Sequence, residues 1–195
     1  MTTPSPHPSD VSGLITAEYQ YIAQTAAEAH ADRARISSFY LIAVGSLVAA
    51  LLGTQAFNGA QFTKLTTLLL CVLFSLLTFL GTSTVLQLGR LRVAWRDSML
   101  AMNRIKELAI QHAPELNDVY LWKTGSLPKL DKKNSISFLQ AIEVSAISGL
   151  MLGTAIFFFL LSFQQVASLW HLGVACICGV AMFFVELKLY KWCLN

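Results

Sequence analysis

The sequence predicts an all-α integral membrane protein with four transmembrane helices, the first two of which extend into a cytoplasmic helical hairpin. Four apolar segments each have about the 20 residues that a helix needs to cross a bilayer. They cover residues 37–57, 65–86, 138–163 and 169–190. The chain is 55% hydrophobic and 13% charged, which is about half the charged share of a soluble domain. Composition and segment length therefore favour a membrane protein.

The basic residues are distributed unevenly around these segments. Of the 14 Lys and Arg residues, only Lys64 lies between the first and second segments, and the loop 164–171 has none. The others precede the first segment, lie between the second and third, or lie at the C-terminal end of the chain (Lys188 and Lys191). Because basic loops stay in the cytoplasm, we expect a multi-pass membrane protein with cytoplasmic N- and C-termini.

The segments outside the membrane are predicted to be mostly helical. Residues 1–13 are rich in Pro and Ser and predict a disordered tail, whereas residues 14–112 predict the hairpin. Residues that are apolar or small, apart from Arg33, recur at alternating steps of four and three up to the start of the first span, in the order Ile15, Tyr19, Ile22, Ala26, Ala29, Arg33, Ile36 and Tyr40. This heptad pattern is typical of closely packed helices. The loop 113–136 contains Pro114, Gly125 and Pro128 and predicts irregular structure.

Small residues recur every fourth position in two spans and predict close helix packing. One stripe is Gly45, Ala49 and Gly53, and the other is Ser145, Gly149 and Gly153. The contacts could form within one subunit or between subunits. Four spans in so short a chain bury little surface by themselves, so we expect a homo-oligomer packed through both stripes.

Glu143 and Glu186 are the two acidic residues inside the predicted spans. An ionisable group at this depth is a functional candidate by default. At similar depths, the two could face one cavity, and rings of carboxylates around an oligomer favour cations. The alternative is a pair of interfacial salt bridges with Arg90, Arg92 or Lys188.

Five arginines flank the membrane on the cytoplasmic side of the first two spans: Arg33, Arg35, Arg90, Arg92 and Arg96. Guanidinium groups bind phosphate oxygens in pairs. If the two helices pack antiparallel, the cluster could bind an anionic lipid headgroup or a nucleotide-like ligand. The alternative is a basic girdle required by topology alone.

The sequence contains no pattern that predicts catalysis. It has no phosphate-binding loop, no GxGxxG and no HExxH motif, and its four cysteines form no CxxC pair. We therefore expect no enzyme activity, no cofactor and no metal site.

An Ala-rich helix ending in Ala31–Arg35 stands directly before the first span, and a basic helix, Arg90–Lys106, stands directly after the second. This layout, over about residues 14–112, resembles the SLATT-type membrane effectors associated with bacterial nucleotide-signalling defence systems. The resemblance implies a pore and a location in the bacterial inner (plasma) membrane. The third and fourth spans depart from the two-span SLATT pattern, and no functional residue can be carried over.

Two functions follow as expectations. The first is a homo-oligomeric membrane channel or pore, a membrane-disrupting effector of antiviral defence gated through its cytoplasmic helices. The second is a non-conducting scaffold or accessory subunit that docks a soluble cytoplasmic partner. The lipid bilayer is a partner in either case.

Overall fold

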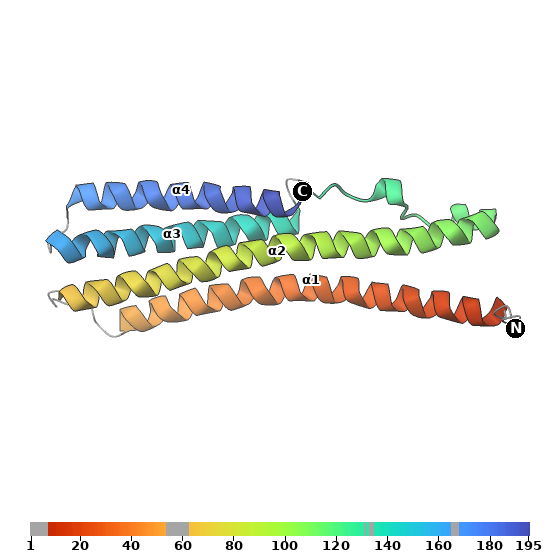
Figure 1. Cartoon of the computed structure of the whole chain (residues 1–195), viewed down its shortest axis with the longest axis horizontal. Coiled ribbons are helices and arrows are strands. Elements are labelled where there is room, and N and C mark those ends of the chain that lie inside the picture. Colours follow the sequence, from red (N-terminus) through yellow and green to blue (C-terminus); the bar gives the residue numbers. More distant parts are fainter. Residues whose placement is uncertain (1–7, 54–62, 131, 133–134, 165–167) are drawn as a thin grey trace, which may run out of the picture. The chain divides into compact units, whose positions relative to one another are not determined.

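The computed structural model describes the chain except for residues 1–7, 54–62, 131, 133–134 and 165–167. The described part contains four long helices and no strand (Figure 1). These are α1 (Pro8–Gly53), α2 (Lys64–His112), α3 (Ile136–Gln164) and α4 (Leu169–Cys193). Two short 3-10 helices, η1 (Pro114–Asn117) and η2 (Thr124–Ser126), lie between α2 and α3.

All four α-helices are long and apolar enough to cross a membrane, as the sequence predicts. The second, third and fourth predicted spans fall inside α2, α3 and α4; α3 and α4 exceed their spans by a few residues, whereas α2 continues beyond its span to His112. Helix α1 ends at Gly53, and residues 54–57 of the first predicted span lie outside the described residues. The chain is therefore a multi-pass membrane protein by the length and composition of its helices.

The predicted disordered tail is too long. Helix α1 begins at Pro8, so residues 8–13 are helical, and residues 1–7 lie outside the described part of the chain. Proline is well tolerated in the first turn of a helix, because the N–H that it lacks has no partner there. Pro and Ser in this stretch are therefore also compatible with the first turns of a helix, so their presence alone does not predict a disordered tail.

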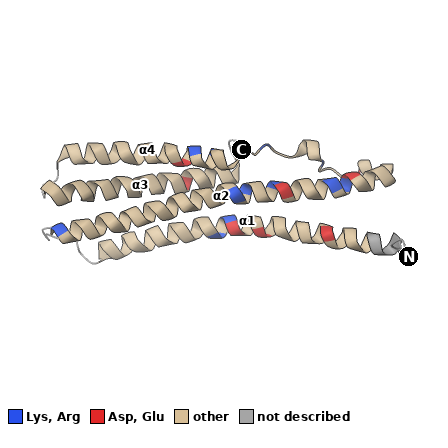
Figure 2. Ribbon diagram, viewed as in Figure 1, with Lys and Arg blue, Asp and Glu red and all other residues tan. Residues whose placement is uncertain are grey.

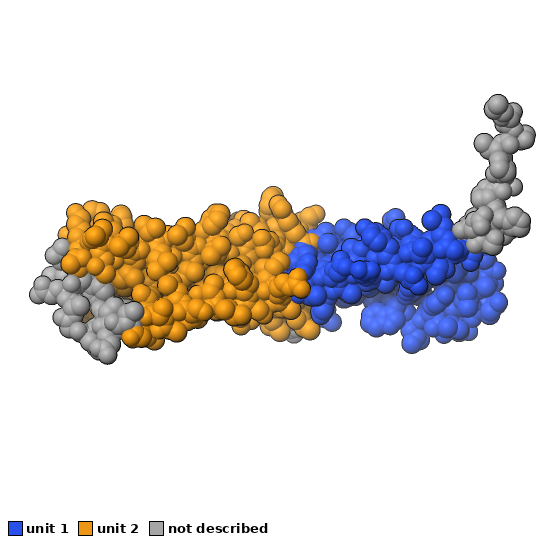
Figure 3. Space-filling view, turned by 90° about the horizontal axis from the view of Figure 1, so that it is seen from below, with its two compact units in different colours: residues 1–32, 91–132 blue, residues 33–90, 133–195 orange. Residues whose placement is uncertain are grey.

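The structure divides into two compact units (Figure 3). Unit 1 contains residues 1–32 and 91–132, and unit 2 contains residues 33–90 and 133–195. Helices α1 and α2 have 46 and 49 residues, more than twice the length that a span needs. Each therefore supplies residues to both units, whereas α3 and α4 belong to unit 2 alone.

Two positions of the predicted heptad pattern are buried in unit 1, whereas Ile15 is 37% exposed. Ala26 and Ala29 are buried at 3% and 7% exposure, and small side chains at such positions allow helices to approach closely. The segment after α2 is held by polar contacts, because Thr124 Oγ1 donates to Glu107 Oε1 at 2.6 Å. The ammonium group of Lys106 also lies 6.0 Å from the ring centroid of Tyr120.

Unit 2 is held together by close backbone packing at glycines. A Cβ on Gly149 would lie 2.6 Å from the carbonyl oxygen of Gly179, and one on Gly153 would lie 2.8 Å from that of Ala175. A Cβ on Gly89 of α2 would likewise lie 2.7 Å from Cβ of Cys193. Only glycine fits at such distances, and packing of this kind is the main force between helices in lipid.

Charged residues are sparse in the membrane-spanning stretches of unit 2. Figure 2 shows long runs without Lys, Arg, Asp or Glu in each of the four helices. Any buried charge in these stretches therefore needs a physical explanation of its own.

Candidate functional site

Glu186 of α4 is fully buried inside unit 2, with 0% of its surface exposed. Its Oε1 atom lies 2.7 Å from Thr82 Oγ1 of α2 and 2.7 Å from Ser148 Oγ of α3. Both hydroxyls also lie near the carbonyl oxygen of Thr78, at 3.0 Å for Thr82 and 3.3 Å for Ser148. Each hydroxyl has one proton, and the shorter contacts favour donation to the carboxyl oxygen.

The local sequence explains how these groups meet. Thr78 and Thr82 are four residues apart on α2, so they lie on one face of that helix. Gly81 lies beside them, and a Cβ there would be 2.6 Å from Ser148 Cβ and 2.8 Å from Tyr40 Oη. The missing side chain of Gly81 therefore lets α1 and α3 approach α2 at the level of Glu186.

A second polar contact lies one turn further along α4. Tyr190 is four residues after Glu186, and its Oη is 2.9 Å from Ser137 Oγ of α3. Both side chains are about 1% exposed. The inner face of α4 thus carries two buried polar residues that bind hydroxyl groups of α3.

Three buried oxygen atoms around Glu186 make no hydrogen bond of good distance and angle with any described residue. They are Glu186 Oε2, Ser145 Oγ and Tyr40 Oη. Ser145 is nevertheless a polar neighbour of the Glu186 carboxyl group, and Tyr40 of α1 is one of Ser148, so each pair is in weak polar contact. Together with Thr82 and Ser148, they form what we call the Glu186 cluster, to which all four α-helices contribute. Buried polar atoms without partners are rare in folded proteins, so this cluster requires an explanation.

The salt-bridge alternative does not account for Glu186. Within the described part of the chain, its carboxyl group meets hydroxyl groups and no ammonium or guanidinium group. Arg90 and Lys188 are exposed, and the Arg92 guanidinium lies 4.9 Å from the ring centroid of Trp95. A carboxylate in an apolar environment without a cation is costly.

Glu143 has a different environment, and the structure does not bring it to Glu186. It is exposed on α3, whereas Ser145 and Ser148, which face Glu186, are fully buried. Residues two apart on an α-helix lie on nearly opposite faces, so Glu143 points away from the face that carries Ser145. Within the described chain, the two carboxyl groups therefore do not share one cavity.

The two small-residue stripes also differ. Gly45, Ala49 and Gly53 are exposed on α1, and a Cβ on Gly45 or Gly53 would meet no described atom within 4 Å. Ser145, Gly149 and Gly153 are buried, the glycines against α4 of the same chain. The expected role of this second stripe between copies is corrected: it packs helices within one chain, because α4 already occupies it.

The predicted arginine cluster is divided between the two units. Arg33, Arg35 and Arg90 belong to unit 2, and Arg92 and Arg96 belong to unit 1. Arg33 and Arg92 are buried, at 4% and 7% exposure. The binding of an anionic lipid headgroup or nucleotide-like ligand by these five arginines stays a prediction.

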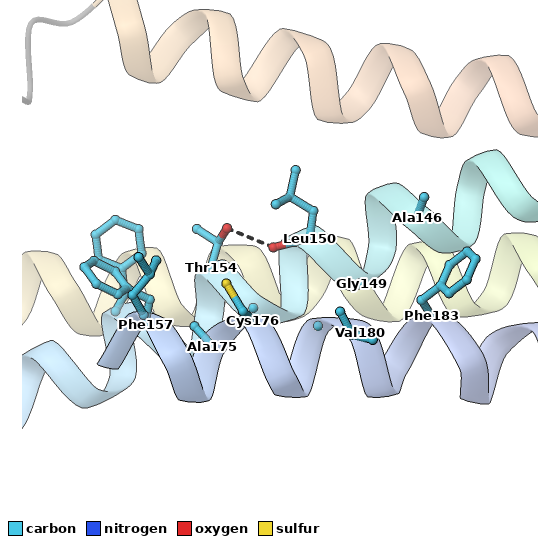
Figure 4. Close-up of a pocket in the computed structure, with 13 residues that line it drawn as sticks. Ala146, Gly149, Leu150, Thr154, Phe157, Ala175, Cys176, Val180 and Phe183 are labelled. Carbon is cyan, nitrogen blue, oxygen red and sulfur yellow. Dashed lines mark hydrogen bonds between the residues drawn. The ribbon is translucent and has the colours of Figure 1, made fainter. Parts of the chain in front are cut away.

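An apolar groove of about 640 Å³ runs along α3 and α4 in unit 2 (Figure 4). Gly149, Gly153 and Ala175 lie along it, and the larger Leu150 and Phe183 line it as well. The hydroxyl of Thr154 is used within α3, where it donates to Leu150 O at 2.9 Å. The groove therefore presents an apolar surface suited to lipid chains or another apolar helix.

Sequence analysis singles out Glu186 but misses Thr82, Ser148 and Gly81. Two pairs of hydroxyl residues in the sequence could have predicted Thr82 and Ser148. Thr78 and Thr82 are four residues apart on α2, and Ser145 and Ser148 are three apart on α3, so each pair lies on one face of its helix. Tyr40 appears in the heptad pattern, which predicts only helix packing for it.

Comparison of the chain with protein-family models, with curated proteins and with solved structures finds no match.

Proposed function

We propose that the chain forms a homo-oligomeric channel or pore in the bacterial inner membrane, with both termini in the cytoplasm. The observation that carries this proposal is the fully buried Glu186, which meets hydroxyl groups but no cation among the described residues. Such a residue lowers the stability of a membrane-spanning bundle and is typical of ion pathways. A purely structural helix bundle has no need of it.

Two further features support self-association and control. The exposed stripe of Gly45, Ala49 and Gly53 offers a smooth surface for a helix of another copy. Unit 1 provides a helical region outside the apolar stretches, which we propose to be the cytoplasmic gate. Because Glu186 is sealed within one chain, we interpret the described conformation as a closed state.

Conduction is tested with the purified full chain in planar bilayers. We expect discrete current steps and a preference for cations. Replacing Glu143 with Gln removes an exposed charge with little change in volume, so a shift in reversal potential would show that it lines the water-filled path. If the reconstituted oligomer carries no current at any voltage or pH tested, the channel proposal is wrong.

The resemblance to SLATT-type effectors adds a role in antiviral defence. Its test is expression in bacteria, followed by a dye that reports membrane potential. We expect depolarisation after induction, and no depolarisation by a Gly149→Leu chain that cannot pack its helices. Normal membrane potential with the protein present in the membrane fraction would contradict the effector role.

A non-conducting scaffold is the second candidate, and one observation favours it. Val119, Leu121 and Trp122 of unit 1 are 66%, 83% and 65% exposed. Exposed apolar residues this close together are typical of a binding surface. Recovery of one stoichiometric soluble partner, lost on Leu121→Asp and Trp122→Asp substitution, together with absent conductance, would support the scaffold.

A further inference from the structure

We propose that the Glu186 cluster is a binding site for one monovalent cation, H⁺ or Na⁺. The site is formed by Glu186, Thr82, Ser148, Ser145 and Tyr40. It goes beyond the proposed channel, because a site of this kind would exist whether or not the oligomer conducts. The site is therefore tested by the dependence of thermal stability on pH and Na⁺ rather than by current.

The unsatisfied oxygens indicate a positively charged ligand. Glu186 Oε1 receives two hydroxyl groups at 2.7 Å, whereas Oε2 is buried without a partner in the described structure. Tyr40 Oη and Ser145 Oγ are also buried without a hydrogen bond of good geometry, and their weak polar contacts with Ser148 and Glu186 leave lone pairs available. A positive charge at the carboxyl group would remove the cost of a buried carboxylate and use the remaining lone pairs.

The chemistry of the cluster favours a single positive charge. Every polar atom at the site is an oxygen, of one carboxyl group, several hydroxyl groups and the carbonyl of Thr78. Oxygen ligands suit hard cations and not soft ones. One carboxylate neutralises H⁺ or Na⁺ completely, whereas a divalent ion would leave an unbalanced charge in an apolar bundle. Among the described residues, no group of three or more His, Cys, Asp or Glu could hold a divalent metal.

The groups that face Glu186 limit what can titrate there. Helix α1 contributes Tyr40, α2 contributes Thr82 with Thr78, and α3 contributes Ser145 and Ser148. Among these, only Tyr40 has a side chain of a type that ionises in water at an accessible pH, and that type does so near pH 10. A change in binding at a pH below the range in which tyrosine ionises is therefore assigned to Glu186.

The site joins helices that are far apart in the sequence. Thr82 and Ser148 are 104 and 38 residues from Glu186, and Tyr40 is on α1. A bound cation would lower the repulsion between the carboxylate and the surrounding lone pairs. It would therefore stabilise the contact between α4 and both α2 and α3, to a degree that grows with its concentration.

Thermal unfolding of the full chain in nanodiscs tests the site. The chain is heated at a series of pH values in choline chloride, and again with Na⁺ or K⁺ replacing choline at constant ionic strength. If H⁺ is the ligand, the Tm falls as the pH rises, because the stabilising proton is lost. If Na⁺ is the ligand, Na⁺ raises the Tm at high pH with a dependence on its concentration.

Glu186→Gln separates these effects from general effects of salt and pH, since the amide has nearly the same shape and binds neither ion as a carboxylate. We expect the Tm of this variant to lose the part of its dependence on pH or Na⁺ concentration that comes from ligand binding at Glu186. Equal pH and Na⁺ dependence in the two proteins would overturn the proposal, whatever their absolute stability.

Thr82→Val and Thr84→Val form a matched pair on α2. Both hydroxyls lie near a carbonyl oxygen of their own helix, but Thr84 donates to Leu80 O at 2.9 Å, whereas the shorter contact of Thr82 is with Glu186 Oε1 at 2.7 Å. Loss of a hydrogen bond to a charged group is worth about tenfold in affinity. We expect Thr82→Val to shift the midpoint of the H⁺ or Na⁺ dependence by about that factor, and Thr84→Val to leave it in place. The same midpoint in both variants would exclude Thr82 from the site.

Discussion

The stripes on α1 and α3 have the same spacing of small residues but different surroundings. Gly149 and Gly153 lie against α4 so closely that a methyl group would collide with its backbone. A methyl group on Gly45 or Gly53 would instead have no described atom within 4 Å. The pattern thus predicts that two helices can approach but does not indicate whether the partner belongs to the same chain. In lipid, helices associate mainly by close packing, so a helix of the same chain and a helix of another copy can both pack against such a stripe.

The largest effect is expected from Gly149→Leu. The added side chain collides with Gly179 O, which lies 2.6 Å from the Cβ position, so α3 and α4 must separate. We expect a loss of about 3 kcal/mol in unfolding free energy, the upper end for overpacked cores. Gly173→Leu on α4 is the control, because a Cβ there meets no described atom within 4 Å. Equal stability of the two variants would contradict the α3–α4 packing.

A smaller loss is expected from Gly81→Ala, which introduces a single methyl group beside the Glu186 cluster. Its Cβ would lie 2.6 Å from Ser148 Oγ and 2.8 Å from Tyr40 Oη. The two hydroxyl groups can turn away, but Ser148 Cβ also lies 2.6 Å from the added Cβ and moves only with its backbone, so we expect a loss of about 1–2 kcal/mol in chemical or thermal unfolding. Gly45→Ala should instead be neutral or slightly stabilising, since alanine favours helices. An unchanged Gly81→Ala protein would mean that α1 and α3 do not converge on α2 at this position.

Gly45→Leu tests the open stripe directly. We expect the unfolding free energy of the single chain to change by no more than about 0.5 kcal/mol, because no described part of the chain packs there. If the stripe is the interface between copies, the mass measured in nanodiscs should fall towards the monomer, while Gly173→Leu leaves it unchanged. A chain that is already monomeric without substitution would remove the physical basis of the homo-oligomer.

The smallest effect on stability is expected from Glu143→Gln, at most about 0.5 kcal/mol in unfolding free energy. The side chain is exposed, so removing its charge strands no partner. Thermal unfolding beside Glu186→Gln would show which of the two carboxyl groups is part of the packed interior. A large loss of stability from Glu143→Gln would mean that its face of α3 is covered by another copy.

The spans could be predicted from the sequence because apolar length is a property of consecutive residues. The burial of Glu186 and the exposure of Glu143 could not, because both are acidic residues in apolar helices and differ only in how each helix is rotated. The hydroxyl partners of Glu186 come from other helices, 38 and 104 residues away. Local periodicity contains no information on such pairs. Likewise, the spacing of Ser145, Gly149 and Gly153 gives no indication that the residue at its start faces a carboxyl group.

The pairing of α2 with α4 through Thr82 and Glu186 has a consequence for biosynthesis. Thr82 is translated 104 residues before its partner Glu186. A ribosome that adds about 5–20 residues per second needs roughly 5–20 s for that interval. During this time the polar face of α2 is in the insertion machinery or the bilayer without the helix that completes it. The nascent chain therefore passes through a stage in which three helices await the fourth, and this is the stage most exposed to misassembly and proteolysis.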